Sequence, residues 1–241
     1  MTEDVNVLLA DAVWPELTDR PLVLVPVGST EQHGPHLPFD TDTVIADAVA
    51  RRAAERLPRA VVAPALAYGS SGEHQSFPGT SSIGGQVLRA TIVELVRSMS
   101  TWSQRVVLVN GHGGNVGALS SAVQQMVDEG HDVAWVPCAT EDVDLHAGLT
   151  ETSLMLHLRP DSVRLDQAEV GDTRPLADII GQLVAGGVAA VSPNGVLGDP
   201  TRADVALGRR VLEDMVEQTV TAVIGGVVDP RGRLRHPLEV A

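Results

Sequence analysis

Short apolar runs alternate with amphipathic stretches along most of this chain. The run Leu22–Val27 is continuous, apolar and rich in β-branched residues, which is typical of a strand buried on both faces of a sheet. Three further short strands are predicted at Val61–Leu66, Arg105–Val109 and Asp132–Val136. Apolar residues at helical spacing predict helices over Asp42–Leu57, Gln86–Trp102, Val116–Val127, Leu176–Val184 and Arg202–Val223. Strands that alternate with helices predict an α/β fold with a mostly parallel central sheet covered on both faces.

Nothing in the sequence divides the chain. Its 241 residues are enough to bury one sizeable core, and they contain no repeat, low-complexity tract or interdomain linker. We therefore expect one domain over residues 1–241. The pattern is less informative after Pro160, and the tail after Asp229-Pro230 is predicted to be irregular.

Charge and composition limit the partners and the location of the protein. The formal net charge is −14, which argues against nucleic acid and anionic membranes as partners, because both reward basic patches. No apolar run is long enough to cross a bilayer, and residues 1–6 are acidic where a signal peptide is basic and then apolar. The chain is therefore expected to be cytoplasmic. Its one cysteine, Cys138, is expected to be a small buried apolar residue.

The absence of lysine excludes several kinds of chemistry. All 17 basic residues are arginine. A Schiff base with substrate, an internal pyridoxal aldimine and the phosphate-binding lysine of a P-loop are therefore impossible. A carbamylated lysine that bridges two metals is excluded as well, so a carboxylate or solvent must bridge any two-metal site.

The segment after the first predicted strand, residues 31–42, holds the densest group of candidate ligands. In an extended segment, residues two apart point the same way, so Glu31 and His33 can face one pocket. Asp42 lies close behind them in the sequence. Carboxylate and imidazole groups that converge are suitable ligands for a divalent metal. The alternative is a polar loop in which Asp42 only caps the next helix.

A second polar segment, Tyr68–Gly79, has the glycines and serines of a loop that wraps a ligand. Glu73 and His74 in this loop are candidates to support metal ligands or to contact substrate. The alternative is a solvated turn.

Two more candidates stand where other predicted elements begin or end. His112 lies in the glycine-rich turn Asn110–Asn115, between a buried strand and a helix, which is where open α/β sheets bind ligands. The turn does not have the G-x-G-x-x-G pattern of a dinucleotide site, so His112 is expected to project into the crevice of Glu31 and His33 instead, or to be structural. Glu151 precedes a further apolar helical segment, where it can be a ligand or can simply favour the helix dipole.

Taken in order, three motifs resemble the creatininase family. They are Glu31-Gln-His-Gly with Asp42 eleven residues later, Asn110-Gly-His-Gly-Gly-Asn, and His146-Ala-Gly-x-x-Glu-Thr-Ser. The resemblance extends from about Val13 to the last predicted helix. It implies a three-layer α/β/α fold and a two-metal site that hydrolyses C–N bonds in cyclic or open amides.

The resemblance also implies roles for individual residues. Glu31, His33, Asp42 and His112 match metal ligands, with Asp42 bridging the two ions. Creatininase has a further glutamate ligand two residues after the glycine-flanked histidine, where this chain has Gly114. This departure argues against creatinine as the substrate, and Glu151 is the best candidate for the missing carboxylate.

The implied cofactors are two divalent ions, and ligands without sulfur admit zinc, ferrous iron or manganese. A metal-bound water with a pKa near 7 would attack the amide. His146 is expected to protonate the departing nitrogen, or else to support a ligand.

The implied substrate is a short modified precursor peptide, cleaved near its C-terminus to release a Val-Tyr-derived fragment. An arginine is expected to hold the terminal carboxylate. The alternatives are a small amide of the creatinine or formamidopyrimidine type, or a non-catalytic metal-binding scaffold. The resemblance further implies a homo-oligomer, of which a hexamer is one form.

Overall fold

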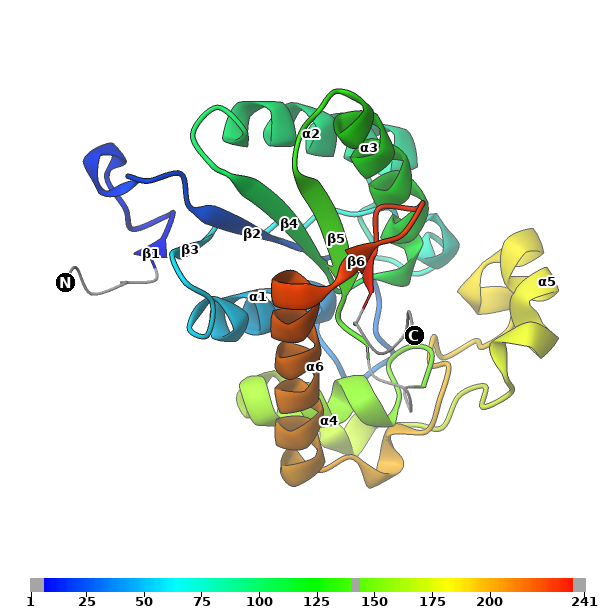
Figure 1. The fold of residues 1–241 in the computed structure, drawn as a ribbon. Helices are drawn as coiled ribbons and strands as arrows, with labels where there is room; N and C mark the ends of the chain where they lie inside the picture. Colours follow the sequence, from blue (N-terminus) through cyan, green and yellow to red (C-terminus); the bar gives the residue numbers. More distant parts are fainter. Residues whose placement is uncertain (1–6, 140–143, 236–241) are drawn as a thin grey trace.

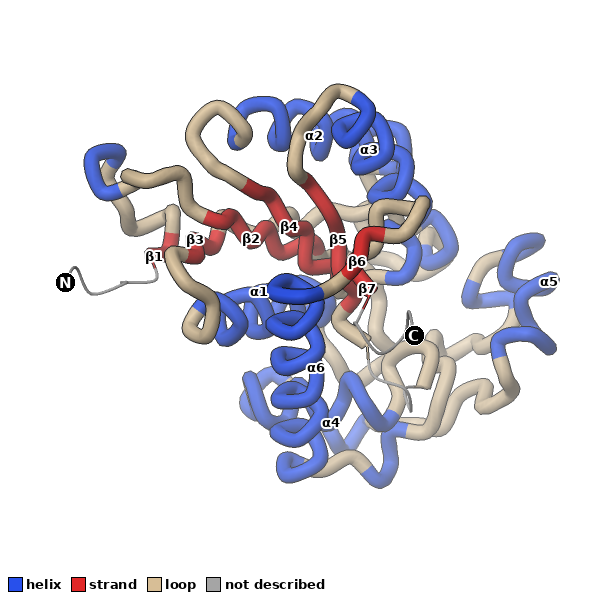
Figure 2. The backbone as a smooth tube through the Cα atoms, viewed as in Figure 1, coloured by secondary structure: helices blue, strands red, loops and turns tan. Residues whose placement is uncertain are grey.

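The central sheet consists of five parallel strands. The computed structural model describes residues 7–139 and 144–235. The strands are β1 (Val7–Leu8), β2 (Leu22–Val27), β3 (Ala60–Val62), β4 (Arg105–Asn110) and β5 (Val133–Pro137), and their order in the sheet is β1-β3-β2-β4-β5. β2 therefore lies between β3 and β4, and its last residue, Val27, pairs with Asn110. Figure 2 shows the strands side by side, with helices around them.

Helices cover both faces of the sheet. The helices in the described residues are α1 (Thr41–Ala54), α2 (Gly84–Met99), α3 (Val116–Asp128), α4 (Leu149–Leu158), α5 (Leu176–Gly186), which stands apart from the sheet (Figure 1), and α6 (Val205–Gly225). α2 and α3 cover one face, and α1, α4 and α6 lie on the other side (Figure 1). Along β2, Leu22 and Leu24 belong to one apolar cluster, and Val23, Val25 and Val27 belong to the other. The expected three-layer α/β/α architecture with a parallel sheet is thereby confirmed.

Some predicted boundaries are wrong, and the structure gives the reasons. The predicted strand Val61–Leu66 ends at Val62. Ala63 still donates to Leu24, but Pro26 of β2 has no amide hydrogen to continue the ladder, and Leu66 then pairs with Val27 as an isolated bridge. The last long helix begins at Val205 rather than Arg202, because the Asp204 side chain accepts hydrogen bonds from two amides of its first turn.

The part of the tail after Asp229-Pro230 that the structure describes, up to residue 235, is not irregular, contrary to the prediction. β6 (Val227–Val228) and β7 (Leu234–Arg235) form an antiparallel pair. The turn between them is held by the Asp229 carboxylate, which accepts from the amides of Arg231 and Arg233. Leu234 is buried, so the hairpin has its own contact with the core.

Two expectations about single features complete the fold. Cys138 is partly buried and packs against the core. None of the helices in the described ranges combines the length and apolar character needed to cross a membrane.

Candidate metal centre

The candidate ligands come together at the carboxyl edge of the sheet. Glu31 and His33 follow β2, and His112 follows β4, so adjacent parallel strands deliver them to the same edge. Asp42 lies in the first turn of α1, and Glu151 lies in the first turn of α4. The structure thus brings these five residues together at one edge of the sheet.

Glycine at position 111 is what permits this close approach. A Cβ atom on Gly111 would lie 2.5 Å from the backbone carbonyl oxygen of Asp42. Any side chain there would push the start of α1 away from the end of β4. Asp42 does not occupy the N-cap position of α1. The N-cap residue is Asp40, and the side chain of Asp40 makes no capping hydrogen bond. The alternative that Asp42 only caps the helix is therefore wrong.

The two carboxylate oxygens of Asp42 face two different histidines. Its Oδ1 lies 3.0 Å from His33 Nε2, and its Oδ2 lies 3.4 Å from His112 Nδ1. Glu151 Oε2 approaches His33 Nε2 to 3.9 Å, and Glu31 Oε2 approaches His112 Nε2 to 3.2 Å. Three sets of three potential ligand atoms result. His33–Asp42–Glu151 and Glu31–Asp42–His112 share Asp42, and the third set is Glu31–His33–His146.

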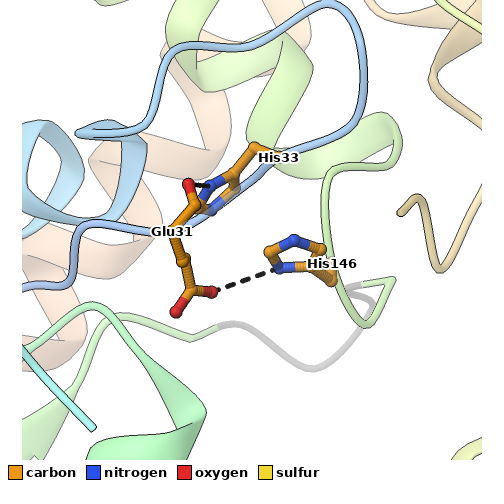
Figure 3. A group of neighbouring side chains, drawn as sticks. All are labelled: Glu31, His33 and His146. Carbon is orange, nitrogen blue, oxygen red and sulfur yellow. Dashed lines mark hydrogen bonds and ion pairs between the residues drawn. The ribbon is translucent and has the colours of Figure 1, made fainter. Parts of the chain in front are cut away.

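Glu31 is the most deeply placed carboxylate of the group. It is fully buried, and neither of its oxygens accepts a hydrogen bond. His74 Nε2 lies 3.2 Å from its Oε1, and His146 Nδ1 lies 3.7 Å from the same oxygen. Figure 3 shows Glu31 beside His33 and His146, with a dashed line to each. Asp42 Oδ2 is also buried without a hydrogen-bond donor. Buried carboxylate oxygens that lack donors are costly unless a cation compensates them.

Backbone carbonyls fix which nitrogen of two imidazoles carries the proton. His33 Nδ1 donates to the carbonyl of Glu31 over 3.1 Å, which leaves Nε2 with a lone pair toward Asp42 in the neutral ring. His146 Nε2 donates to the carbonyl of Gln32 over 2.8 Å, which leaves Nδ1 facing Glu31. Carbonyl-oriented imidazoles of this kind are the usual support for metal-binding histidines. The donor set therefore fits divalent metal ions.

The pKa values of the buried groups also indicate that the site favours a positive charge. Burial by itself lowers the pKa of His33, but the carboxylates of Asp42, Glu151 and Glu31 outweigh it and raise that pKa to about 10. Burial likewise lowers the pKa of His112, and Glu31 and its other acidic neighbours raise it well above the usual value. Burial, with the charge of Asp42 in addition, raises the pKa of Glu151 to about 7. The carboxylates thus hold protons in their vicinity wherever no other cation neutralises them.

The polar loop places its two candidates differently. His74 is buried and contacts Glu31, so a solvated turn is the wrong description for it. Glu73 is partly exposed, with Oε1 3.4 Å from His112 Nε2. A Cβ on Gly114 would lie 2.5 Å from this Glu73 oxygen. Glu73 therefore fills space that any side chain at position 114 would need.

Gln32 is a residue of the centre that the sequence analysis did not single out. Its side-chain amide group is buried and donates to His74 Nδ1 over 2.9 Å and to the carbonyl of Gly195 over 3.0 Å. Its Oε1 accepts from the amide of Gly34 over 2.8 Å. Gln32 thereby orients His74 with Nε2 toward Glu31. Its place between two candidate ligands was the only signal in the sequence, because its partners come from distant segments.

A cavity of about 910 Å³ opens beside the candidate ligands. Glu73, His74, His112 and His146 line its polar end, together with Gly113 and Gly114. His36, which belongs to the same polar stretch as Glu31, does not reach this centre, since its Nε2 pairs with the hydroxyl of Thr152 in α4. The site thus joins a cluster of buried charged groups to a space for a substrate.

Comparison with known proteins points to one family. The family model named Creatininase, described as creatinine amidohydrolase, matches residues 10–223. The chain is 56% identical over 201 residues to the mycofactocin precursor peptide peptidase of Mycolicibacterium smegmatis, covering 81% of each chain. It is 52% identical over 223 residues to the peptidase of the same name from Mycobacterium tuberculosis, covering 89% of each.

Solved structures extend the likeness to the fold. A mutant creatininase of the zinc–zinc type superimposes with a TM-score of 0.76 at 28% identity, covering 91% of this chain and 97% of that one. A manganese creatininase gives the same TM-score and identity, covering 91% of this chain and 98% of that one. With the family model matched over nearly the whole chain and the fold shared with solved members, the chain belongs to the creatininase family.

Proposed function

We propose that this chain is a metal-dependent peptidase that cleaves the mycofactocin precursor peptide near its C-terminus. The observation that carries the proposal is the identity of 50–56% to peptidases of that name, over 81–89% of the chain. The buried carboxylates without donors support the metal dependence. The released product would be the Val-Tyr-derived fragment of the modified peptide.

The proposed ligands of two divalent ions are Glu31, His33, Asp42, His112 and Glu151. Asp42 would bridge, because each of its oxygens faces a different histidine. Oxygen and nitrogen donors accept zinc, manganese and ferrous iron alike, and zinc and manganese forms of creatininase have been solved. When bound, the ions would supply a water acidic enough to attack at neutral pH and would polarise the scissile carbonyl.

His146 is the proposed proton donor to the departing nitrogen. An amide nitrogen must be protonated as it leaves, because its anion is too basic. Burial lowers the pKa of His146 well below its usual value, and Nε2 donates to the carbonyl of Gln32, so Nδ1 has no proton in the resting ring. Nδ1 would first take the proton released by the attacking water and would then pass it to the departing nitrogen. His146 also lines the cavity, so it borders the space for a substrate.

The decisive assay incubates metal-loaded protein with the precursor peptide, before and after its modification, and follows cleavage by mass spectrometry. The proposal expects one peptide bond near the C-terminus to be cut in at least one form. Creatinine and a formamidopyrimidine amide serve as comparison substrates. Efficient hydrolysis of either, with both peptides intact, would replace the peptidase by a small-amide hydrolase. Full metal binding without any hydrolysis would indicate a scaffold protein instead.

We further propose that the protein works as a closed homo-oligomer, with a hexamer as one candidate. Support comes from exposed apolar residues such as Trp14 and Val13, which are 86% and 59% exposed. Light scattering at micromolar concentration and physiological salt measures the mass directly. A monomer mass under these conditions would reject the proposal.

A further inference from the structure

The cavity beside the metal centre has one wall that is strongly apolar. Helix α5 contributes Leu176, Ile180 and Val184, whose spacing of four residues puts them on one face. Their exposed fractions are 45%, 46% and 81%. All three line the same cavity of about 910 Å³ that His112 and His146 also line. One continuous space therefore joins the proposed reaction centre to an aliphatic surface.

The neighbouring face of α5 anchors the helix. Ile179 is fully buried, and it packs in a small cluster with Val188 and Leu197, against which Leu183 also lies. Figure 1 shows α5 standing apart from the helices that cover the sheet. This small cluster therefore fixes the direction in which the exposed stripe points.

The end of α5 is tied to the loop that carries Glu73. Gly187, which follows the helix, has φ +70°, and a Cβ there would lie 2.5 Å from the carbonyl oxygen of Glu73. The helix and the polar end of the cavity are thus held at a set separation. Asp178 is the only charged residue of α5, so the helix is apolar on two faces, although the core covers only one.

We propose that Leu176, Ile180 and Val184 form a subsite for a large apolar or aromatic side chain next to the bond that is cleaved. This inference rests on the proposed function, because it takes the cavity to be where the amide substrate lies. The continuity of the stripe with His112 and His146 favours a substrate over a second copy of the chain as the occupant. The cavity also has the size typical of ligand sites, about 300–1,000 Å³.

Ligand binding tests the subsite apart from catalysis. The probes are N-acetylphenylalanine amide and N-acetylalanine amide, with binding to the metal-loaded protein measured by calorimetry. The variants are Ile180→Ala and its matched control Ile224→Ala, since Ile224 is an exposed helical isoleucine, 69% accessible, that does not line the cavity. The wild type should prefer the phenylalanine probe by roughly tenfold or more, the range for one apolar group in a pocket.

Ile180→Ala should remove most of that preference and leave the affinity for the alanine probe unchanged, whereas Ile224→Ala should change neither. Equal binding of both probes by the wild type, or equal effects of the two variants, would overturn the subsite. A lower oligomer mass for Ile180→Ala alone would assign the stripe to a second copy instead. If the probes behave as expected while the precursor peptide is not cut, the proposed substrate fails and the subsite stands.

Discussion

Replacement of Gly114 by alanine tests whether the geometry of the metal centre requires a residue without a side chain at position 114. A Cβ at position 114 would lie 2.4 Å from His112 Nε2 and 2.4 Å from the carbonyl oxygen of Ser70. Ordinary contacts lie at roughly 3.5–4 Å, so the neighbours must move by about 1 Å. His112 is buried and the Ser70 oxygen belongs to the backbone, and neither can swing away as a surface side chain does.

The expected magnitude follows from that displacement. Overpacking of this kind costs about 1–3 kcal/mol of stability, and a misplacement of about 1 Å at a reacting centre costs roughly 10²-fold in rate. Gly114→Ala should therefore lower the melting temperature by about 2–4 °C for each kcal/mol lost, and it should lower kcat/KM and metal content together. Thermal unfolding, peptide cleavage and elemental analysis measure the three quantities.

Gly113 provides a matched control one residue away. A Cβ there meets no atom within 4 Å, and neither glycine has a positive φ. Gly113→Ala should therefore be neutral, or stabilising by about 0.4–1 kcal/mol through loss of freedom in the unfolded chain. Wild-type stability, metal content and activity in Gly114→Ala would refute the argument that this position must lack a side chain.

Three further predictions concern the metal centre, and a fourth concerns the N-terminal cap of α6. Asp42→Ala should lose both metal ions and all activity, and full metal content by elemental analysis would contradict its bridging role. His146→Ala should keep its metal while kcat falls by roughly 10²–10⁴-fold; a parallel loss of metal would make His146 a ligand or its support. Gln32→Met should keep the fold by circular dichroism but lower kcat by roughly tenfold, because His74 loses its donor; an unchanged kcat would deny the positioning role. Asp204→Ala should lower the free energy of unfolding in urea by about 1 kcal/mol, since two amides of α6 lose their cap, and an unchanged midpoint would show that the cap contributes nothing.

Much of the architecture could be predicted from the sequence because local rules decide it. A strand buried on both faces must be apolar throughout, so Leu22–Val27 and β4 were visible as continuous runs. Helical periodicity located α1, α2 and α3 to within a few residues. Turn chemistry was less informative: the hairpin of β6 and β7 depends on the Asp229 carboxylate and on burial of Leu234, neither of which leaves a periodic pattern.

The sequence by itself determined the types of ligand and their approximate positions. Glu31 and His33 are two residues apart after a strand, and His112 stands between glycines after another, so parallel pairing alone brings them to one edge. Only the tertiary structure decided how these groups are held. The buried amide of Gln32, the exclusion of a side chain at Gly114 and the apolar wall of α5 depend on contacts between segments far apart in the chain. Such contacts follow from packing in three dimensions, which no local spacing of residues records.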